Sequence, residues 1–126
     1  QHGLSDCMNK ISNYYSLVIW PDSSSNDYEY HKKLYYQGIG VLVLDHHLAD
    51  KISQYAVIIN NQLSNYPNKE LSGVGVVWQF CRYIDSILEI NYADDFLDLV
   101  ALGNCGDMMS LRSMETRYLI TKGFKK

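Results

Sequence analysis

Three apolar runs in the first half of the chain lack the alternation with polar residues that a half-exposed strand shows. They cover residues 16–20, 40–44 and 56–59. A strand that is buried on both faces of a parallel sheet has this unbroken pattern. We therefore predict three buried, parallel strands at these positions.

The segment between the first two runs has the pattern of a helix. Asn26 and Glu29 have the spacing of a capping box, which predicts that the helix begins there. The helix should continue to about Gln37, and Gly38 should end it.

The second half of the chain is expected to be helical. A polar loop at residues 62–71 is followed from Ser72 by apolar residues at helical spacing. Two further helices are predicted at residues 93–102 and 113–121, and the glycine-punctuated stretch 103–107 is predicted to be a turn. Because strands alternate with helices, the predicted fold class is α/β, with a parallel sheet of at least three strands flanked by helices.

Length and charge narrow the picture. The 126 residues predict a single domain, and the net charge of −3 argues against a strongly basic nucleic-acid surface on this chain. An acidic balance is compatible with a carboxylate-rich site whose charge is offset by bound cations.

Cysteines and hydropathy indicate the compartment. The odd number of cysteines, Cys7, Cys81 and Cys105, matches no disulfide framework and predicts a reducing cytoplasm. Cys81 and Cys105 lie among apolar residues and are predicted to be core thiols. No stretch approaches the roughly 18 apolar residues of a membrane span, so no membrane association is expected.

Candidate metal ligands follow two of the predicted strands. The first strand ends at Asp22 and the second at Asp45, His46 and His47, while Asp107 lies in the glycine-bracketed stretch after a helix. In open α/β sheets, ligands bind beyond the carboxyl ends of the strands. Asp and His together suit a divalent transition metal such as Mn²⁺, and two such ions can clamp a phosphoryl group.

Each of these residues also has a purely structural interpretation. Asp22 alone could cap the next helix, Asp107 alone could form a turn, and a single His at a strand end is usually structural. Two adjacent histidines after an Asp are rarer. We expect the side chains of His46 and His47 to diverge, so that one binds metal and the other faces the substrate.

The motifs together resemble a known family. Residues 45–47, Asp-His-His after an apolar strand, resemble the signature of the DHH phosphoesterases. Residues 21–29 are similar to the second motif of RecJ-like members, residues 71–78 to the helix start that follows the signature, and residues 101–109 to the fourth motif. The resemblance covers nearly all of residues 15–123, and motifs in this order are far more specific than the triplet alone.

The resemblance implies a phosphoesterase that uses two Mn²⁺ ions, with Mg²⁺ as the alternative ion. By motif position, Asp22 would bridge both ions, and His46 and Asp107 would be direct ligands. Asp45 would be a ligand or would orient the site. His47 would face the scissile phosphate and stabilise charge or move a proton.

The chain also departs from the family pattern. The family's first motif, a pair of aspartates, should precede Asp22, but residues 1–21 hold only Asp6. The family's second domain, which grips the substrate, would follow Lys126, and the chain begins at Gln1 rather than Met. We therefore expect a fragment of the catalytic domain that is nearly inactive by itself.

The function that the resemblance implies for the full-length parent is Mn²⁺-dependent exonuclease cleavage of single-stranded DNA, in DNA repair and recombination. One alternative is a phosphodiesterase of the same family that acts on oligonucleotides or cyclic dinucleotides. A second alternative is a non-catalytic α/β module that keeps the fold and binds a partner.

Overall fold

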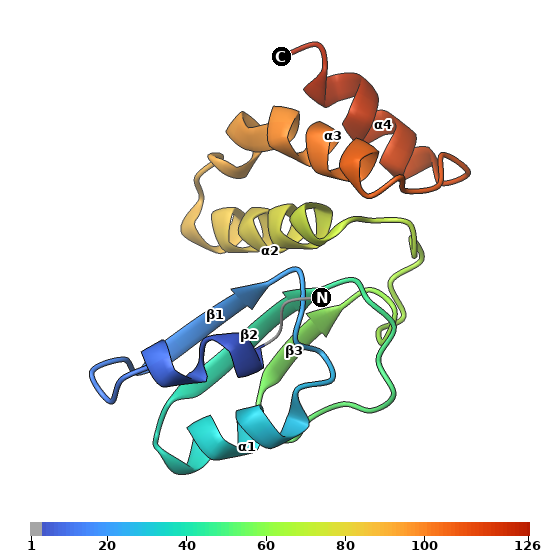
Figure 1. Cartoon of the computed structure of the whole chain (residues 1–126). Coiled ribbons are helices and arrows are strands. Elements are labelled where there is room, and N and C mark those ends of the chain that lie inside the picture. The colour runs from blue at the N-terminus through green and yellow to red at the C-terminus, as the bar shows by residue number, and fades with distance from the viewer. Residues whose placement is uncertain (1–3) are drawn as a thin grey trace. The chain divides into compact units, whose positions relative to one another are not determined.

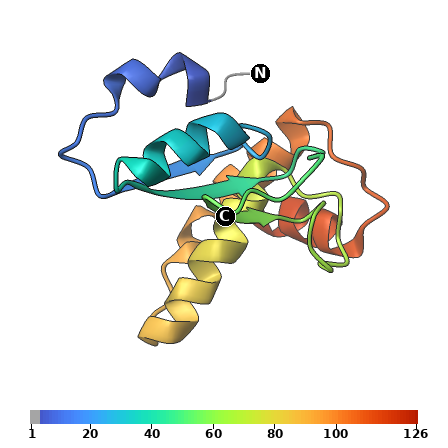
Figure 2. The same cartoon turned by 90° about the horizontal axis from the view of Figure 1, so that it is seen from below.

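The computed structural model describes residues 4–126 and confirms the α/β class (Figure 1, Figure 2). Within this described part of the chain, no helix combines the length and the hydrophobicity needed to cross a lipid bilayer. Along the chain, the elements are η1 (Leu4–Asp6), η2 (Met8–Lys10), β1 (Leu17–Pro21), α1 (Tyr28–Tyr36), β2 (Gly40–Asp45), β3 (Val57–Asn60), α2 (Gly73–Leu88), η3 (Ala93–Phe96), α3 (Leu97–Gly106) and α4 (Met114–Gly123).

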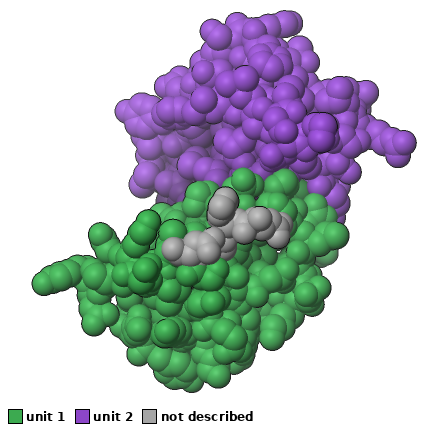
Figure 3. Space-filling model, viewed as in Figure 1, with its two compact units in different colours: residues 1–65 green, residues 66–126 purple. Residues whose placement is uncertain are grey.

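The chain divides into two compact units, residues 1–65 and residues 66–126 (Figure 3). The first unit contains the sheet and α1, and the second contains α2, α3 and α4. That residues 1–126 are one domain and part of a larger catalytic domain stays a prediction.

The sheet of the first unit is parallel, in the order β1-β2-β3 (Figure 1). Pro21 pairs with Leu44, and Asp45 pairs with Asn60. All three predicted strands are confirmed to within one residue at each end. The prediction that all three are buried is wrong for β1 and β3, because Leu17, Ile19 and Val57 are more than half exposed. Because the strands run the same way, their carboxyl ends share one edge of the sheet.

One face of this sheet carries the core of the first unit. Val41 and Val43 point to the same face of β2 and are buried in one cluster with Leu34 of α1, Ile39 and Leu4. Figure 2 shows α1 lying against the sheet. Burying an aliphatic side chain of this size contributes roughly 1.5–3 kcal/mol. This cluster therefore holds α1 against the sheet.

The start of α1 differs from the predicted capping box. Asp27, rather than Asn26, immediately precedes the helix. The Asn26 side chain donates a hydrogen bond to the carbonyl of Leu48 at 3.2 Å and accepts one from the backbone N–H of Asp50 at 3.0 Å. The capping-box prediction is wrong because Asn26 fastens the irregular loop 46–56, which joins β2 to β3, beside the start of the helix.

In the second unit, α2 and α3 pack closely because Gly103 has no side chain. A Cβ atom at Gly103 would overlap Cγ1 of Val74. The neighbouring Asn104 is fully buried, and its side-chain oxygen accepts a hydrogen bond from the backbone N–H of Ser72 at 3.1 Å. The turn predicted here is therefore wrong, because α3 continues to Gly106 and the first glycine serves helix packing.

The prediction that Cys81 and Cys105 are core thiols is also wrong. Both are exposed, and the three cysteines of the chain are free. The buried residues of α3 are Val100, Ala101 and Asn104, a helical spacing that leaves Cys105 off the buried face.

The close approach of α2 and α3 generates a stability prediction. Replacing Gly103 with alanine should lower the free energy of unfolding by about 1–3 kcal/mol, because the added methyl group overpacks the contact with Val74. Urea unfolding followed by circular dichroism measures the change.

The matched control is Gly106→Ala in the same helix. A Cβ at Gly106 would meet no atom of the described residues within 4 Å, so this variant should be neutral or slightly more stable. Equal stabilities for the two variants would contradict the packing role of Gly103.

Candidate metal centre

Asp22 comes directly after β1 and lies beside the end of β2. Its backbone N–H donates to the carbonyl of Leu44 at 2.8 Å, which continues the ladder between the two strands. Its φ of 62° then turns the chain sharply away from the sheet. Aspartate adopts this left-handed conformation more readily than most residues. The alternative in which Asp22 caps α1 is not what the structure shows, because Asp27 holds that position.

Three side chains of the first unit converge at this edge of the sheet. Ligand atoms of Asp22, His46 and His47 lie within 4.8 Å of one another. Nε2 of His46 is 3.2 Å from a carboxylate oxygen of Asp22. The side chain of His46 is 12% exposed and that of Asp22 is 58% exposed, so the group is open to solvent on the aspartate side.

The two histidines do not diverge as expected. Their ring centroids are 4.4 Å apart, with the planes tilted by 57°. The alternation of side chains holds only within a strand, and β2 ends at Asp45, so the backbone of the two histidines is free to turn both rings toward Asp22.

Asp45 is the hydrogen-bond acceptor that orders this turn. Its side chain is 1% exposed. One carboxylate oxygen accepts from the backbone N–H groups of His46 at 2.8 Å and His47 at 3.2 Å, and from Nδ1 of His47 at 2.7 Å. The other accepts from the backbone N–H of Ser25 at 3.2 Å.

These hydrogen bonds decide the charge state of Asp45. Burial by itself would raise the pKa of this carboxyl, but the hydrogen bonds from Ser25, His46 and His47 outweigh it and lower the pKa below its usual value. Asp45 is therefore a buried carboxylate, and both of its oxygens already accept hydrogen bonds from the protein. This geometry fits the orienting role implied for Asp45 better than the alternative of a direct ligand.

The bond to Asp45 also selects the tautomer of His47. Because a carboxylate has no proton to give, Nδ1 of His47 must carry the hydrogen of this bond. Nε2 is then left as the atom that can accept a proton or a metal ion. In many metal sites a carboxylate orients an imidazole ring by accepting a hydrogen bond from one of its nitrogens, as Asp45 does here.

Sequence reasoning missed Asn60, which closes the site from β3. Its side-chain amide donates to Oγ of Ser25 at 2.9 Å and to the carbonyl of His47 at 2.8 Å, and it is almost fully buried. Asn60 thus ties the loop after β1 to the turn after β2. The signal was present, because Asn60 is a polar residue at the carboxyl end of a predicted strand, as Asp45 is.

Contacts of Ser24 with Asp27 and His31 hold the loop between β1 and α1 in place. Ser24 has a φ of 83°, and its hydroxyl donates to a carboxylate oxygen of Asp27 at 2.8 Å and lies 3.4 Å from Nε2 of His31. His31 is completely buried. It is a packing residue of α1, and it supports the loop that carries Asp22.

Asp107 lies in the second unit, where it is the C-terminal capping position of α3. Met108 follows with a φ of 51°, so the chain reverses directly after this aspartate. Of the turn predicted at residues 103–107, only the position of Asp107 is confirmed, because the residues before it are helical. That Asp107 shares metal ions with Asp22 and His46 stays a prediction.

The converging side chains have the chemistry of a divalent metal site. One carboxylate oxygen donor and two imidazole nitrogens are the mixed donor set that first-row transition metals such as Mn²⁺ accept. The exposed side of Asp22 leaves room for water or further ligands. The residues present therefore fit a bound Mn²⁺ ion.

His31 generates a prediction on the pH dependence of stability. Burial lowers the pKa of His31, so below its ordinary value of about 6.5 the unfolded chain binds a proton that the folded chain does not. Folding stability should therefore fall as the pH is lowered from 7.5 to 5.5, by no more than about 1.4 kcal/mol per pH unit from this group. His31→Gln should fall less steeply over this range. Urea unfolding at several pH values measures both slopes, and identical slopes would contradict the assignment.

Comparisons with known proteins place these observations in a family. The model of the N-terminal domain of the DHH family matches residues 2–104. YorK of the SPbeta prophage in Bacillus subtilis, which is named as a single-strand DNA-specific exonuclease, is 42% identical over 127 residues that cover 100% of this chain and 22% of YorK. The single-stranded-DNA-specific exonuclease RecJ of Escherichia coli is 36% identical over 103 residues, 71% of this chain and 18% of RecJ. The chain thus spans about a fifth of these relatives.

Two solved structures show the same fold. The crystal structure of an exonuclease RecJ bound to manganese has a TM-score of 0.84 and 20% identity, and the match covers 95% of this chain and 31% of that one. RecJ of Thermus thermophilus in complex with Mn²⁺ has a TM-score of 0.78 and 22% identity, over 87% of this chain and 17% of that one. At these identities the likeness shows the fold alone. The family match over residues 2–104, together with the Asp-His-His turn after β2, establishes that this chain belongs to the DHH family.

Proposed function

We propose that this chain is the metal-binding part of a Mn²⁺-dependent phosphoesterase that hydrolyses phosphodiester bonds in single-stranded DNA. The observation that carries the proposal is the convergence of Asp22, His46 and His47 at the carboxyl edge of the sheet. Its support from relatives is that YorK and RecJ are named as single-strand DNA exonucleases and that two RecJ structures contain manganese.

Asp22 and His46 would hold the metal, and Asp107 would be a further ligand supplied from the end of α3. Mn²⁺ held there would supply Lewis-acid chemistry, which stabilises charge on a phosphate and makes water more acidic. Asp45 would act by orienting, because its oxygens are occupied by hydrogen bonds from the backbone and from His47.

His47 would face the scissile phosphate. Its side chain is 35% exposed, and Nδ1 is held by Asp45, so Nε2 is the atom that can reach substrate. In the tautomer that Asp45 selects, Nε2 carries no hydrogen, so it can accept a proton. Once protonated, it can stabilise charge on the phosphate oxygens or return the proton to one of them. Asn60 would position His47 through its backbone carbonyl.

We further propose that the longer protein that carries this chain works in DNA repair and recombination in the cytoplasm. The free cysteines fit a reducing compartment.

Residues 1–21 contain a single aspartate, Asp6, where the family pattern has a pair, so the 126-residue chain alone would bind Mn²⁺ weakly and be nearly inactive.

The metal site is tested by Mn²⁺ titration calorimetry of the 126-residue chain. Asp22→Ala and His46→Ala should each weaken Mn²⁺ binding by roughly 10–100-fold or more. Loss of a residue that only hydrogen-bonds to a ligand already has an effect of that size, and these variants remove the ligand itself. Asp50→Ala is the matched control, because Asp50 is an exposed aspartate of the same unit outside the converging group. Unchanged binding in both site variants would end the proposal.

The same titration separates the contribution of Asp107. Asp107→Asn should weaken Mn²⁺ binding, whereas Asp98→Asn, which alters an exposed aspartate in the first turn of the same helix, should not. If both α3 variants bind like the unaltered chain, then Asp107 is not a ligand.

The activity is tested on the longer protein that carries this chain. With Mn²⁺ it should degrade long single-stranded DNA, and His47→Ala should reduce the rate by about 10²–10⁴-fold if His47 moves a proton. Dinucleotides and pyrophosphate are the comparison substrates. Faster cleavage of either substrate than of long single strands would contradict the exonuclease proposal. If the 126-residue chain alone were as active as the longer protein, the expectation that it is nearly inactive would be wrong.

A further inference from the structure

Four tyrosine rings form a surface group on the first unit that includes none of the residues of the metal centre. Tyr28 lies at the start of α1, Tyr35 and Tyr36 lie at its end, and Tyr55 lies just before β3. The ring of Tyr55 is in the middle, with its centroid 5.4 Å from those of Tyr28 and Tyr35 and 6.0 Å from that of Tyr36. We call these four residues the tyrosine cluster.

The tyrosine cluster is not part of the hydrophobic core. Tyr35 is 56% exposed and Tyr36 is 72% exposed, and the core cluster of this unit includes none of the four rings. Edge-to-face and tilted packing against Tyr55 and against each other holds the two exposed rings in place while their faces remain open to solvent. Such rings offer flat, apolar surfaces that need no rearrangement to accept a ligand.

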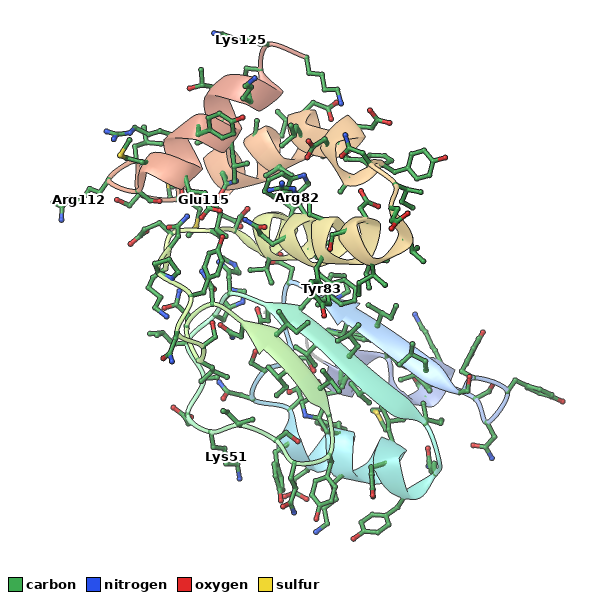
Figure 4. The ribbon with its side chains drawn as sticks, turned by 180° about the vertical axis from the view of Figure 1, so that it is seen from behind. Lys51, Arg82, Tyr83, Arg112, Glu115 and Lys125 are labelled. Atoms are coloured by element: carbon green, nitrogen blue, oxygen red, sulfur yellow. The ribbon has the colours of Figure 1, made fainter. Side chains whose placement is uncertain are left out.

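Positive charge accompanies the rings. Residues 1–65 contain four lysines and no arginine, and three of these lysines, Lys32, Lys33 and Lys51, lie on or beside the tyrosine cluster. Lys51 lies in the loop between β2 and β3 (Figure 4). Its Nζ is 3.9 Å from the ring centroid of Tyr28. A shallow surface groove runs beside Tyr36, and Lys32, Lys33 and Glu29 line it. Glu29 in the groove and Asp50 beside Lys51 offset part of this charge, so the group has closely spaced charges of both signs, with three of the four lysines of the unit.

Aromatic faces interleaved with lysines match one class of ligand. In a single-stranded nucleic acid, unpaired bases stack on aromatic rings while phosphates attract the lysines, and neither contact depends on sequence. A duplex would not fit, because its bases are already stacked on one another. A purely apolar protein partner would leave the lysines without counter-charges.

We propose that the tyrosine cluster with Lys32, Lys33 and Lys51 is a second binding site for single-stranded nucleic acid. Tyr35 and Tyr36 at the end of α1, and Tyr55 before β3, lie toward the amino ends of β2 and β3, opposite the strand ends that carry Asp45 and Asn60. Tyr28 extends the cluster to the start of α1. The site would retain a strand away from the metal centre. This inference rests on the proposed function only in that the retained strand would be the substrate.

The test is binding of a fluorescein-labelled twenty-nucleotide oligothymidylate to the 126-residue chain, measured by fluorescence anisotropy in EDTA so that no cleavage occurs. Alanine at both Tyr35 and Tyr36 should weaken binding between about ten- and a hundredfold, because each lost stacking contact is worth roughly tenfold. Alanine at both Lys32 and Lys33 should lower the slope of log affinity against log salt by about 1.4, since each neutralised phosphate of a single strand contributes about 0.7.

Two matched controls guard against a non-specific effect. Alanine at both Tyr14 and Tyr15 removes an exposed pair of tyrosines elsewhere in the same unit and should leave affinity unchanged. Phenylalanine at both Tyr35 and Tyr36 keeps the stacking faces and should also leave it unchanged. A duplex of the same length should bind more weakly than the single strand.

Several results would overturn the inference. They are unchanged affinity in the Tyr35 and Tyr36 alanine variant, an equal loss in the Tyr14 and Tyr15 variant, or a duplex preference. The chain could instead self-associate, and the cluster variants could abolish that self-association without changing oligonucleotide binding. This result would assign the surface to a protein partner. Asp22→Ala separates this proposal from the metal centre, because that variant should lose Mn²⁺ binding and keep its affinity for the oligonucleotide.

Discussion

The buried carboxylate of Asp45 is the group on which the geometry of the metal centre depends. A charge this deeply buried is tolerated only where hydrogen bonds replace its lost hydration. Here the replacement comes from backbone N–H groups of Ser25, His46 and His47 and from the ring of His47. Satisfying one carboxylate therefore positions the loop after β1 and the turn after β2 together, and the two histidines are presented side by side.

The loop that carries Asp22 is held by compensating contacts. Asp22 and Ser24 both have positive φ values, a conformation that is unfavourable for residues with a side chain. The hydrogen bond from Ser24 to Asp27, packing on His31, and the bond from Asn60 to Ser25 fix the loop despite this cost. A rigid loop keeps the Asp22 carboxylate near His46 before any ion arrives, which reduces the ordering that metal binding requires.

Charge is distributed unevenly over the first unit. Its carboxylates at the strand ends, Asp22 and Asp45, repel a polyanion unless cations are bound between them. Three of its four lysines, Lys32, Lys33 and Lys51, lie beside exposed tyrosine rings on and near α1, together with Glu29. Such a separation lets one surface attract a nucleic acid while another holds metal, even though the chain is acidic overall.

The sequence by itself determined the three strands, the end of α1 at Gly38 and the Asp-His-His turn, because these depend on local periodicity and backbone preference. It did not determine what Gly103 and Asn26 do. From sequence alone, Gly103 predicts a turn and Asn26 predicts a helix cap. Only the structure shows that α2 packs against Gly103 and that a distant loop binds Asn26.

The same limit applies to the site. The ligand types could be read from the chain, but the convergence of His46 and His47 and the bridging role of Asn60 arise from contacts between strands and loops far apart in sequence. Side-chain alternation predicts directions only inside a strand. Beyond its end, tertiary hydrogen bonds decide where each side chain points.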